Sequence, residues 1–160
     1  MIIFQGEFEC KIDAKYRTVL PAKLKACLPE NENSQIVITR SQEPCLTIFP
    51  TSVWEGIYQK VISLNMFSEE YKKFQRTFLR GATTLDLDGQ GRFIVPKLMA
   101  QDTQLENDFI MVGIGERIEV WNPVLYEKYL ISDPAEFSKM TEKILGDKKP
   151  YSFDLNLFKN

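Results

Sequence analysis

The chain carries one short motif twice: an aspartate, an arginine four residues later, one further residue, two hydrophobic residues and a proline. The first copy, DAKYRTVLP, runs from Asp13 to Pro21, and the second, DGQGRFIVP, from Asp88 to Pro96. A carboxylate at the start of a turn accepts backbone N–H bonds or pairs with the arginine, which fixes the loop. The guanidinium then presents a fork of donors that matches phosphate oxygens or the O6 and N7 atoms of guanine. In each copy this chemistry indicates nucleic-acid contact, and the alternative is an ion pair that only closes the turn.

Basic residues gather around the first copy only. Between Lys11 and Lys25 there are five lysines or arginines against one aspartate, whereas Asp86 to Ala100 holds two basic and two acidic residues. The whole chain has a net charge of −2 and a pI of about 5.3, so attraction to nucleic acid requires a local patch. We therefore predict that the first copy makes most phosphate contacts, while the second supplies Arg92 or mainly structure. Each lysine alone is equally well explained as a solvated surface charge.

Residue types that common catalytic sites need are missing. The chain has no histidine, which excludes Ser-His-Asp and Cys-His nucleophiles and imidazole acid–base chemistry. A magnesium pair at Asp86 and Asp88 would share one strand face, but the first copy has Lys11 and Asp13 there instead. We interpret the three cysteines, which lack a CxxC spacing, as buried free thiols: Cys10, Cys27 and Cys45. We therefore predict no enzymatic activity, no metal, no cofactor and no small-molecule substrate.

The composition is that of a folded globular chain, with 44% apolar and 26% charged residues. No apolar run is long enough for a transmembrane helix. Residues 1–6 lack both the basic start and the long apolar core of a signal peptide. We therefore expect a cytoplasmic protein with no membrane partner.

The repeat extends beyond the motif and indicates an internal duplication. Gly6 and Gly81 share the 75-residue offset of the two aspartates, and residues 46–50 match residues 118–122 at an offset of 72. Alternating apolar residues before each motif, and the proline after it, predict strand, turn, strand and short helix, followed by a second hairpin. The first half places its strands near residues 8–12, 17–20, 35–39 and 45–49, with a helix at 21–28; the second repeats them at 83–87, 92–95, 109–113 and 117–121. These patterns predict an α+β fold.

Longer helices are predicted after each half. A capping box that begins at Ser52 opens the first, and residues 68–80 form the second. Asn122 and Asp133, each followed by a proline, predict the starts of two more. The tail at residues 146–160 is rich in apolar side chains, and it either docks on a neighbouring subunit or stays disordered.

Three stretches together resemble the MraZ family: DAKYR and LPAKL in the first half, DGQGRFIVP in the second, and IGERIEVW at residues 114–121. The resemblance spans about residues 5–131. It implies the fold of the AbrB-like, or swapped-hairpin, DNA-binding superfamily, with two half-barrels in one chain related by a pseudo-two-fold axis. The expected domains are residues 5–60 and 81–131, with a connecting helix at 61–80 and a C-terminal helix and tail at 132–160.

The resemblance also implies a function. Members of this family regulate transcription of the bacterial division and cell-wall gene cluster, form ring-shaped homo-oligomers and bind direct DNA repeats upstream of their own operon. The chain is then expected to bind double-stranded DNA in the cytoplasm, associated with the nucleoid. The alternative is a protein-interaction or antitoxin-like barrel that does not bind DNA itself.

Two groups of residues make up the predicted site. Lys11, Lys15 and Lys25 resemble the contact positions that flank the arginine in AbrB-like proteins. The family usually has glycine where Tyr16 stands, as Gly91 does in the second copy. We expect the turn to tolerate this side chain and leave it to stack on sugar or base, whereas a positive φ there would strain it. The predicted DNA contacts are Lys11, Lys15, Tyr16, Arg17, Lys25 and Arg92. The predicted loop-structuring residues are Asp13, Asp88 and Gly91.

Overall fold

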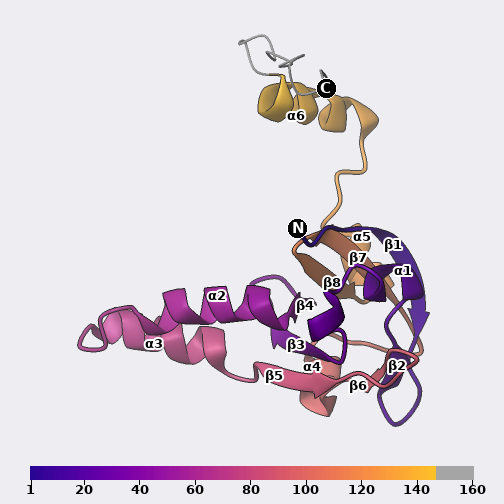
Figure 1. The fold of residues 1–160 in the computed structure, drawn as a ribbon. Helices are drawn as coiled ribbons and strands as arrows, with labels where there is room; N and C mark the ends of the chain where they lie inside the picture. Colours follow the sequence, from indigo (N-terminus) through magenta and orange to yellow (C-terminus); the bar gives the residue numbers. More distant parts are fainter. Residues whose placement is uncertain (147–160) are drawn as a thin grey trace, which may run out of the picture. The chain divides into compact units, whose positions relative to one another are not determined.

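A computed structural model describes residues 1–146 of the chain (Figure 1). These residues fall into two compact units, the first being Met1–Tyr126 and the second beginning at Glu127. Each unit is described by itself below. None of the helices in the described residues is both long and apolar enough to cross a membrane.

The first unit repeats one order of elements. The strands are β1 (Phe4–Lys11), β2 (Arg17–Val19), β3 (Gln35–Arg40), β4 (Leu46–Pro50), β5 (Thr83–Asp86), β6 (Arg92–Ile94), β7 (Asp108–Gly115) and β8 (Arg117–Trp121). The helices are α1 (Ala22–Lys25), α2 (Thr51–Ile62), α3 (Glu69–Leu79), α4 (Lys97–Asp102) and α5 (Pro123–Glu127), with a 3₁₀ turn at Glu30–Glu32. Two strands, a short helix, two strands and a further helix follow one another twice, and α3 lies between the copies. The predicted α+β class and element order are confirmed.

The two copies exchange strands within one six-stranded sheet, in the order β1-β7-β8-β4-β3-β5. The first strand of each copy pairs with the third strand of the other, and the fourth strands, β4 and β8, pair at the centre around Thr47 and Glu119. A separate antiparallel ribbon joins the second strands, β2 and β6. Every strand pair is antiparallel, and the pairing order is the same from either end. The sheet is open at β1 and β5, so residues 1–146 contain no closed barrel and the predicted barrel detail is not confirmed.

One hydrophobic core serves both copies. Its buried side chains come from strands and short helices of each half and include Phe4, Leu20, Leu24, Ile36, Ile48, Phe93, Val95, Met99, Phe109, Met111 and Ile118. Cys10 and Cys45 are buried free thiols, as predicted, while Cys27 is only half-buried. Burial raises the pKa of Cys10 to about 11 and that of Cys45 to about 12, so both stay protonated and unreactive near neutral pH.

The first short helix is shorter than the predicted range of residues 21–28. It covers only Ala22–Lys25. Beyond it, the N–H groups of Cys27 and Leu28 bond to carbonyls three residues back, so the chain continues as tight turns. Pro29 disfavours helical geometry at Leu28, so the helix cannot fill the predicted range to its end. Leu24 and Leu28 are nevertheless buried, as the apolar spacing predicts.

Helices α2 and α3 form a hairpin beside the sheet (Figure 1). The Trp54 ring of α2 stacks on the Phe78 ring of α3, with the two ring centroids 6.2 Å apart. The capping box predicted at Ser52 is wrong. The helix begins one residue earlier, at Thr51, and the Ser52 hydroxyl donates instead to Glu32 at 2.8 Å. In α3 the cap is present, because the Ser68 hydroxyl accepts from the Tyr71 N–H at 3.3 Å.

Two further predicted helix starts are confirmed. The Asn122 side chain accepts from the Val124 N–H at 2.8 Å at the start of α5. In the second unit, Asp133 accepts from the Ala135 N–H at 3.0 Å and caps α6 (Pro134–Leu145). Exposed apolar side chains on α6 include Phe137, Met140 and Ile144. The tail predicted to dock or to be disordered lies beyond residue 146, outside the described residues.

Candidate nucleic-acid interface

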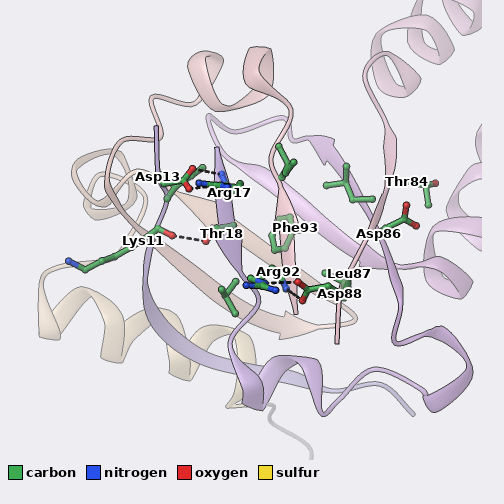
Figure 2. A pocket seen from close by; sticks show the side chains of 14 residues that line it. Lys11, Asp13, Arg17, Thr18, Thr84, Asp86, Leu87, Asp88, Arg92 and Phe93 are labelled. Atoms are coloured by element: carbon green, nitrogen blue, oxygen red, sulfur yellow. Dashed lines mark hydrogen bonds and ion pairs between the residues drawn. The ribbon is translucent and has the colours of Figure 1, made fainter. Parts of the chain in front are cut away.

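The first motif forms a closed turn between β1 and β2 (Figure 2). The Asp13 Oδ1 atom accepts backbone N–H bonds from Lys15 and Arg17, both at 2.9 Å, and its Oδ2 atom accepts from Arg17 Nε at 2.7 Å. Backbone bonds from the Asp13 N–H to the Arg17 carbonyl and from the Tyr16 N–H to the Asp13 carbonyl complete the turn. The backbone N–H of Arg17 is the main cause that lowers the pKa of Asp13 below its ordinary value. The carboxylate is thus held charged, and it orients the arginine.

The second motif repeats this geometry between β5 and β6. Asp88 Oδ1 accepts from the N–H groups of Gln90 and Arg92 at 2.9 Å, and Oδ2 accepts from Arg92 Nε at 2.5 Å. The Arg92 N–H, followed by its side chain, lowers the pKa of Asp88 to about 2. The side chains of Arg17 and Arg92 are 59% and 62% exposed. The ion pair and the outward arginine therefore coexist in both copies, with Nε held by the aspartate.

The two turns differ at their fourth residue. Tyr16 has φ +60° and Gly91 has φ +81°, so both adopt the left-handed region. The expectation that the first turn simply tolerates a side chain is wrong, because that conformation is strained for a tyrosine. The reason lies in the turn's second role: the Tyr16 carbonyl accepts from the Val95 N–H, and the Gly91 carbonyl accepts from the Leu20 N–H. The Tyr16 ring is half-buried and packs against the core.

Strands β2 and β6 bring both arginines onto one surface. Arg17 pairs with Ile94 and Val19 with Arg92, with Thr18 opposite Phe93 between them. Thr18 and Phe93 are buried, so the ribbon turns its other face outward. Four exposed side chains form this outer face of the ribbon: Arg17, Val19, Arg92 and Ile94. Sequence reasoning missed Val19 and Ile94, although their positions two residues after each arginine place them on its strand face.

A groove of about 1280 Å³ runs beside the ribbon (Figure 2). Apart from Thr84 and Leu85, it is lined by equivalent residues of the two copies, which include both aspartate–arginine pairs. Figure 2 places the pair Asp13 and Arg17 on one side and the pair Asp88 and Arg92 on the other. The predicted arginines and loop-structuring aspartates are thus brought together at one site.

The predicted lysines are distributed differently. Lys11 forms an exposed ion pair with Asp108 at 3.6 Å, and Lys15 is exposed in the first turn. Lys25 reaches across to the other copy, where its Nζ donates to the Gly89 carbonyl at 2.8 Å. The Lys25 charge therefore lies at the second turn, and the charge difference between the copies is smaller in space than along the sequence.

The site's donors suit an anionic or guanine partner. Each guanidinium donates from its Nε to a carboxylate. Within residues 1–146, its Nη groups make no hydrogen bond. The same residues contain no group of three His, Cys, Asp or Glu side chains arranged to hold a metal ion. Two oriented guanidinium groups on an exposed ribbon match phosphate oxygens or the major-groove edge of guanine.

Comparison with known proteins agrees with the internal duplication. A family model described as "MraZ protein, putative antitoxin-like" matches the chain twice, over residues 3–77 and 78–148. A protein of Cytophaga hutchinsonii named transcriptional regulator MraZ is 45% identical over 149 residues, 93% of this chain and 99% of its own length. Similar proteins of Roseiflexus sp. and Caldanaerobacter subterraneus, with the same name, are 35% and 30% identical over 142 residues, 89% of this chain and 96% of their own lengths.

The two matches meet between residues 77 and 78, inside α3, the helix that lies between the two copies. The relatives match nearly end to end and are named as regulators, not enzymes. With a duplicated motif, a duplicated element order and relatives at this level of identity, the chain belongs to the MraZ family of transcriptional regulators.

Proposed function

We propose that this protein binds double-stranded DNA at promoter direct repeats and regulates transcription of the bacterial division and cell-wall gene cluster. The observation that carries the proposal is the pair of aspartate-held arginines on the outer face of the β2–β6 ribbon. The names of the relatives support a role in transcription. The protein acts in the cytoplasm, associated with the nucleoid.

The two-stranded form of the ribbon suits a DNA groove. A two-stranded antiparallel ribbon fits the major groove, which is about 12 Å wide. An arginine that bonds O6 and N7 of guanine there makes the commonest base-specific contact. Because Asp13 and Asp88 hold the Nε atoms, the Nη groups are orientated before DNA arrives, which reduces the conformational entropy cost of binding.

The other proposed contacts surround this pair. Lys11, Lys15 and Lys25 contribute positive charge toward the phosphates, and Tyr16 contributes through the shape of its turn and its partly exposed ring. Asp13, Asp88 and Gly91 structure the loops. The first copy supplies most phosphate contacts, since Lys11 and Lys15 have no basic equivalents at Asp86 and Gln90.

One such surface binds weakly, with a nonspecific dissociation constant of roughly 10⁻⁴ to 10⁻⁶ M at physiological salt. We propose that the protein forms a ring-like homo-oligomer whose subunits engage neighbouring repeats. Linked sites of this kind gain roughly 10² to 10⁴ in avidity without any new contact. An acidic chain then binds DNA because its local charge is repeated.

The strand exchange supports the swapped-hairpin assignment. The first strand of each copy completes the other copy's hairpin, and the two copies have the same pairing order about the β4–β8 centre. We propose pseudo-two-fold halves at residues 5–60 and 81–131, connected at 61–80, with a separate segment at 132–160.

The test is binding of the full chain to duplex DNA taken from upstream of its own gene, compared with a shuffled duplex of equal composition. Fluorescence anisotropy over a range of salt concentrations gives the affinity and the salt slope. We expect preference for the repeat-bearing duplex and a steep slope, both reduced in Arg17→Ala. Lys72→Ala, an exposed charge removed from α3, is the matched control and should bind like wild type.

Native mass spectrometry of the same samples measures the oligomer. Equal, weak binding to both duplexes, or an Arg17→Ala variant that binds like wild type, would contradict the proposal and favour the protein-interaction module. A monomer that still prefers the repeats would contradict the ring alone.

A further inference from the structure

We propose that Val19 and Ile94 are specificity-determining residues that contact the 5-methyl groups of thymines beside the guanines bound by the two arginines. This inference rests on the proposed function, since it assumes that the outer face of the β2–β6 ribbon enters the major groove. It adds apolar contacts, made by Val19 and Ile94, to the hydrogen bonds that the two arginines donate from the same surface.

The register of the ribbon sets the pattern of this surface. Arg17 lies directly opposite Ile94, and Val19 directly opposite Arg92. The arginines therefore occupy one diagonal of the outer face and the aliphatic side chains the other. Residues directly opposite in such a pair have Cβ atoms about 5 Å apart. Each arginine that reaches a base edge thus brings an aliphatic side chain to within one or two base pairs of it.

Burial shows that these aliphatic side chains do not serve the core. Val19 is 47% exposed and Ile94 is 59% exposed, while Thr18 and Phe93 on the opposite face of the ribbon are buried. The exposed β-branched residue recurs at the same place in both copies, two positions after the arginine. One exposed aliphatic residue needs no explanation, but a duplicated pair in register with the two arginines forms a patterned surface.

The chemistry of the major groove supplies a partner for this pattern. Thymine is the base that presents a methyl group there, and aliphatic side chains recognise it by apolar contact. The methyl lies on the same groove floor as the O6 and N7 atoms that arginine reads. A surface with two guanidinium groups and two aliphatic groups on crossed diagonals therefore selects guanine with thymine close by.

The experiment is a cycle in which DNA methyl groups and protein side chains are removed separately and together. The full chain and the double variant Val19→Ala, Ile94→Ala are titrated with the upstream repeat-bearing duplex, synthesised with thymine or with deoxyuridine throughout. Deoxyuridine pairs like thymine but lacks the 5-methyl group. We expect wild type to bind the deoxyuridine duplex more weakly, by about fourfold for each thymine methyl group that Val19 or Ile94 touches. We expect the variant to bind both duplexes equally.

Two controls separate direct recognition from other effects. Val124→Ala removes an exposed valine, 69% accessible, from α5 and should retain the full deoxyuridine effect. Val19→Thr keeps the shape of the side chain and replaces one methyl group with a hydroxyl, so the part of the effect that it loses would not reflect a rearranged ribbon. Circular dichroism melting curves check that each variant is folded.

Each outcome decides the matter. If the wild-type protein binds the thymine and deoxyuridine duplexes equally, the inference is overturned while DNA binding remains intact. An effect that persists in the double variant also overturns it, since the methyl groups then act through DNA shape or through other residues. A wild-type protein that shows no preference for the repeats overturns the proposed function, and the inference with it.

Discussion

The two turns share their hydrogen bonds but not their surroundings. In both, one aspartate accepts two backbone N–H bonds and holds an arginine Nε. The first turn has Tyr16 in the left-handed region and carries Lys15, whereas the second has Gly91 there and receives Lys25 from the opposite copy. The aspartate and the backbone therefore fix the shape of each turn. The residues around the turn determine its local charge and its backbone strain, and these differ between the two copies.

The largest expected difference concerns the arginines. If the protein binds DNA as proposed, Arg17→Ala and Arg92→Ala each remove a contact worth about 1–3 kcal/mol, which is roughly 5- to 150-fold in affinity. We expect the larger effect for Arg17, because Lys15 beside it adds a charge that Gln90 lacks. Anisotropy titrations of the upstream duplex with both variants measure this. Equal reductions in affinity would show that the two turns contribute alike despite their neighbours.

The backbone difference predicts the next largest effect. Gly91→Ala places a side chain at φ +81°, 3.3 Å from the Leu20 carbonyl, and should lower the free energy of unfolding by about 1–2 kcal/mol. Gly89→Ala is the matched control in the same turn, since nothing lies within 4 Å of its added Cβ. Urea unfolding followed by circular dichroism measures both. A Gly91→Ala variant as stable as wild type would show that the turn relaxes without cost.

Lys25 offers a smaller test of the link between the copies. Lys25→Met keeps the aliphatic stem and removes the bond to Gly89, so stability should fall by less than about 1 kcal/mol. Adding Lys25→Met should lower the DNA affinity of the Arg17→Ala variant by a larger factor than it lowers that of the Arg92→Ala variant. The reason is that Lys25 lies beside the second turn, which has already lost its arginine in Arg92→Ala. Lys23→Met, an exposed lysine of the same helix, is the control. A larger added loss of affinity in the Arg92→Ala variant would show that the Lys25 charge acts together with the first turn.

The smallest effect is a titration. The pKa of Asp88 is about 2 against an ordinary 3.8, so the stability that this carboxylate provides is complete above about pH 4 and is lost as pH falls through about 2. Asp13 has a lowered pKa for the same reason, so its contribution is also lost only at acid pH. Carboxyl-detected NMR titration measures each midpoint. A midpoint at the ordinary value for Asp88 would show that its turn is open in solution.

The sequence predicted those features that local patterns encode. Alternating apolar residues, the prolines and the duplicated motif located the strands of each half, its second hairpin and the aspartate–arginine pairs. The left-handed conformation of Tyr16 was missed, because it is required by the carbonyl bond to Val95 in the other copy. The destination of Lys25 was missed for the same reason, since the hydrogen bond spans 64 residues.

The strand exchange was implied by the family resemblance and not by any periodicity. Apolar alternation identifies β1 and β7 as strands, but it contains no information about which strands pair. Val19 and Ile94 were overlooked because apolar residues in a strand are ordinarily assigned to the core. Only the buried Thr18 and Phe93 show which face of the ribbon is inward.

The order of strands in the sheet also determines when the protein is able to fold during synthesis. Phe4, near the start of the chain, pairs with Gly115 in β7, so the first strand made must await one of the last. Contacts this distant in sequence slow folding and leave unpaired strand edges exposed in the meantime. A nascent chain that stalls before β7 therefore leaves both edges of β1 unpaired, and synthesis through β7 covers one of them.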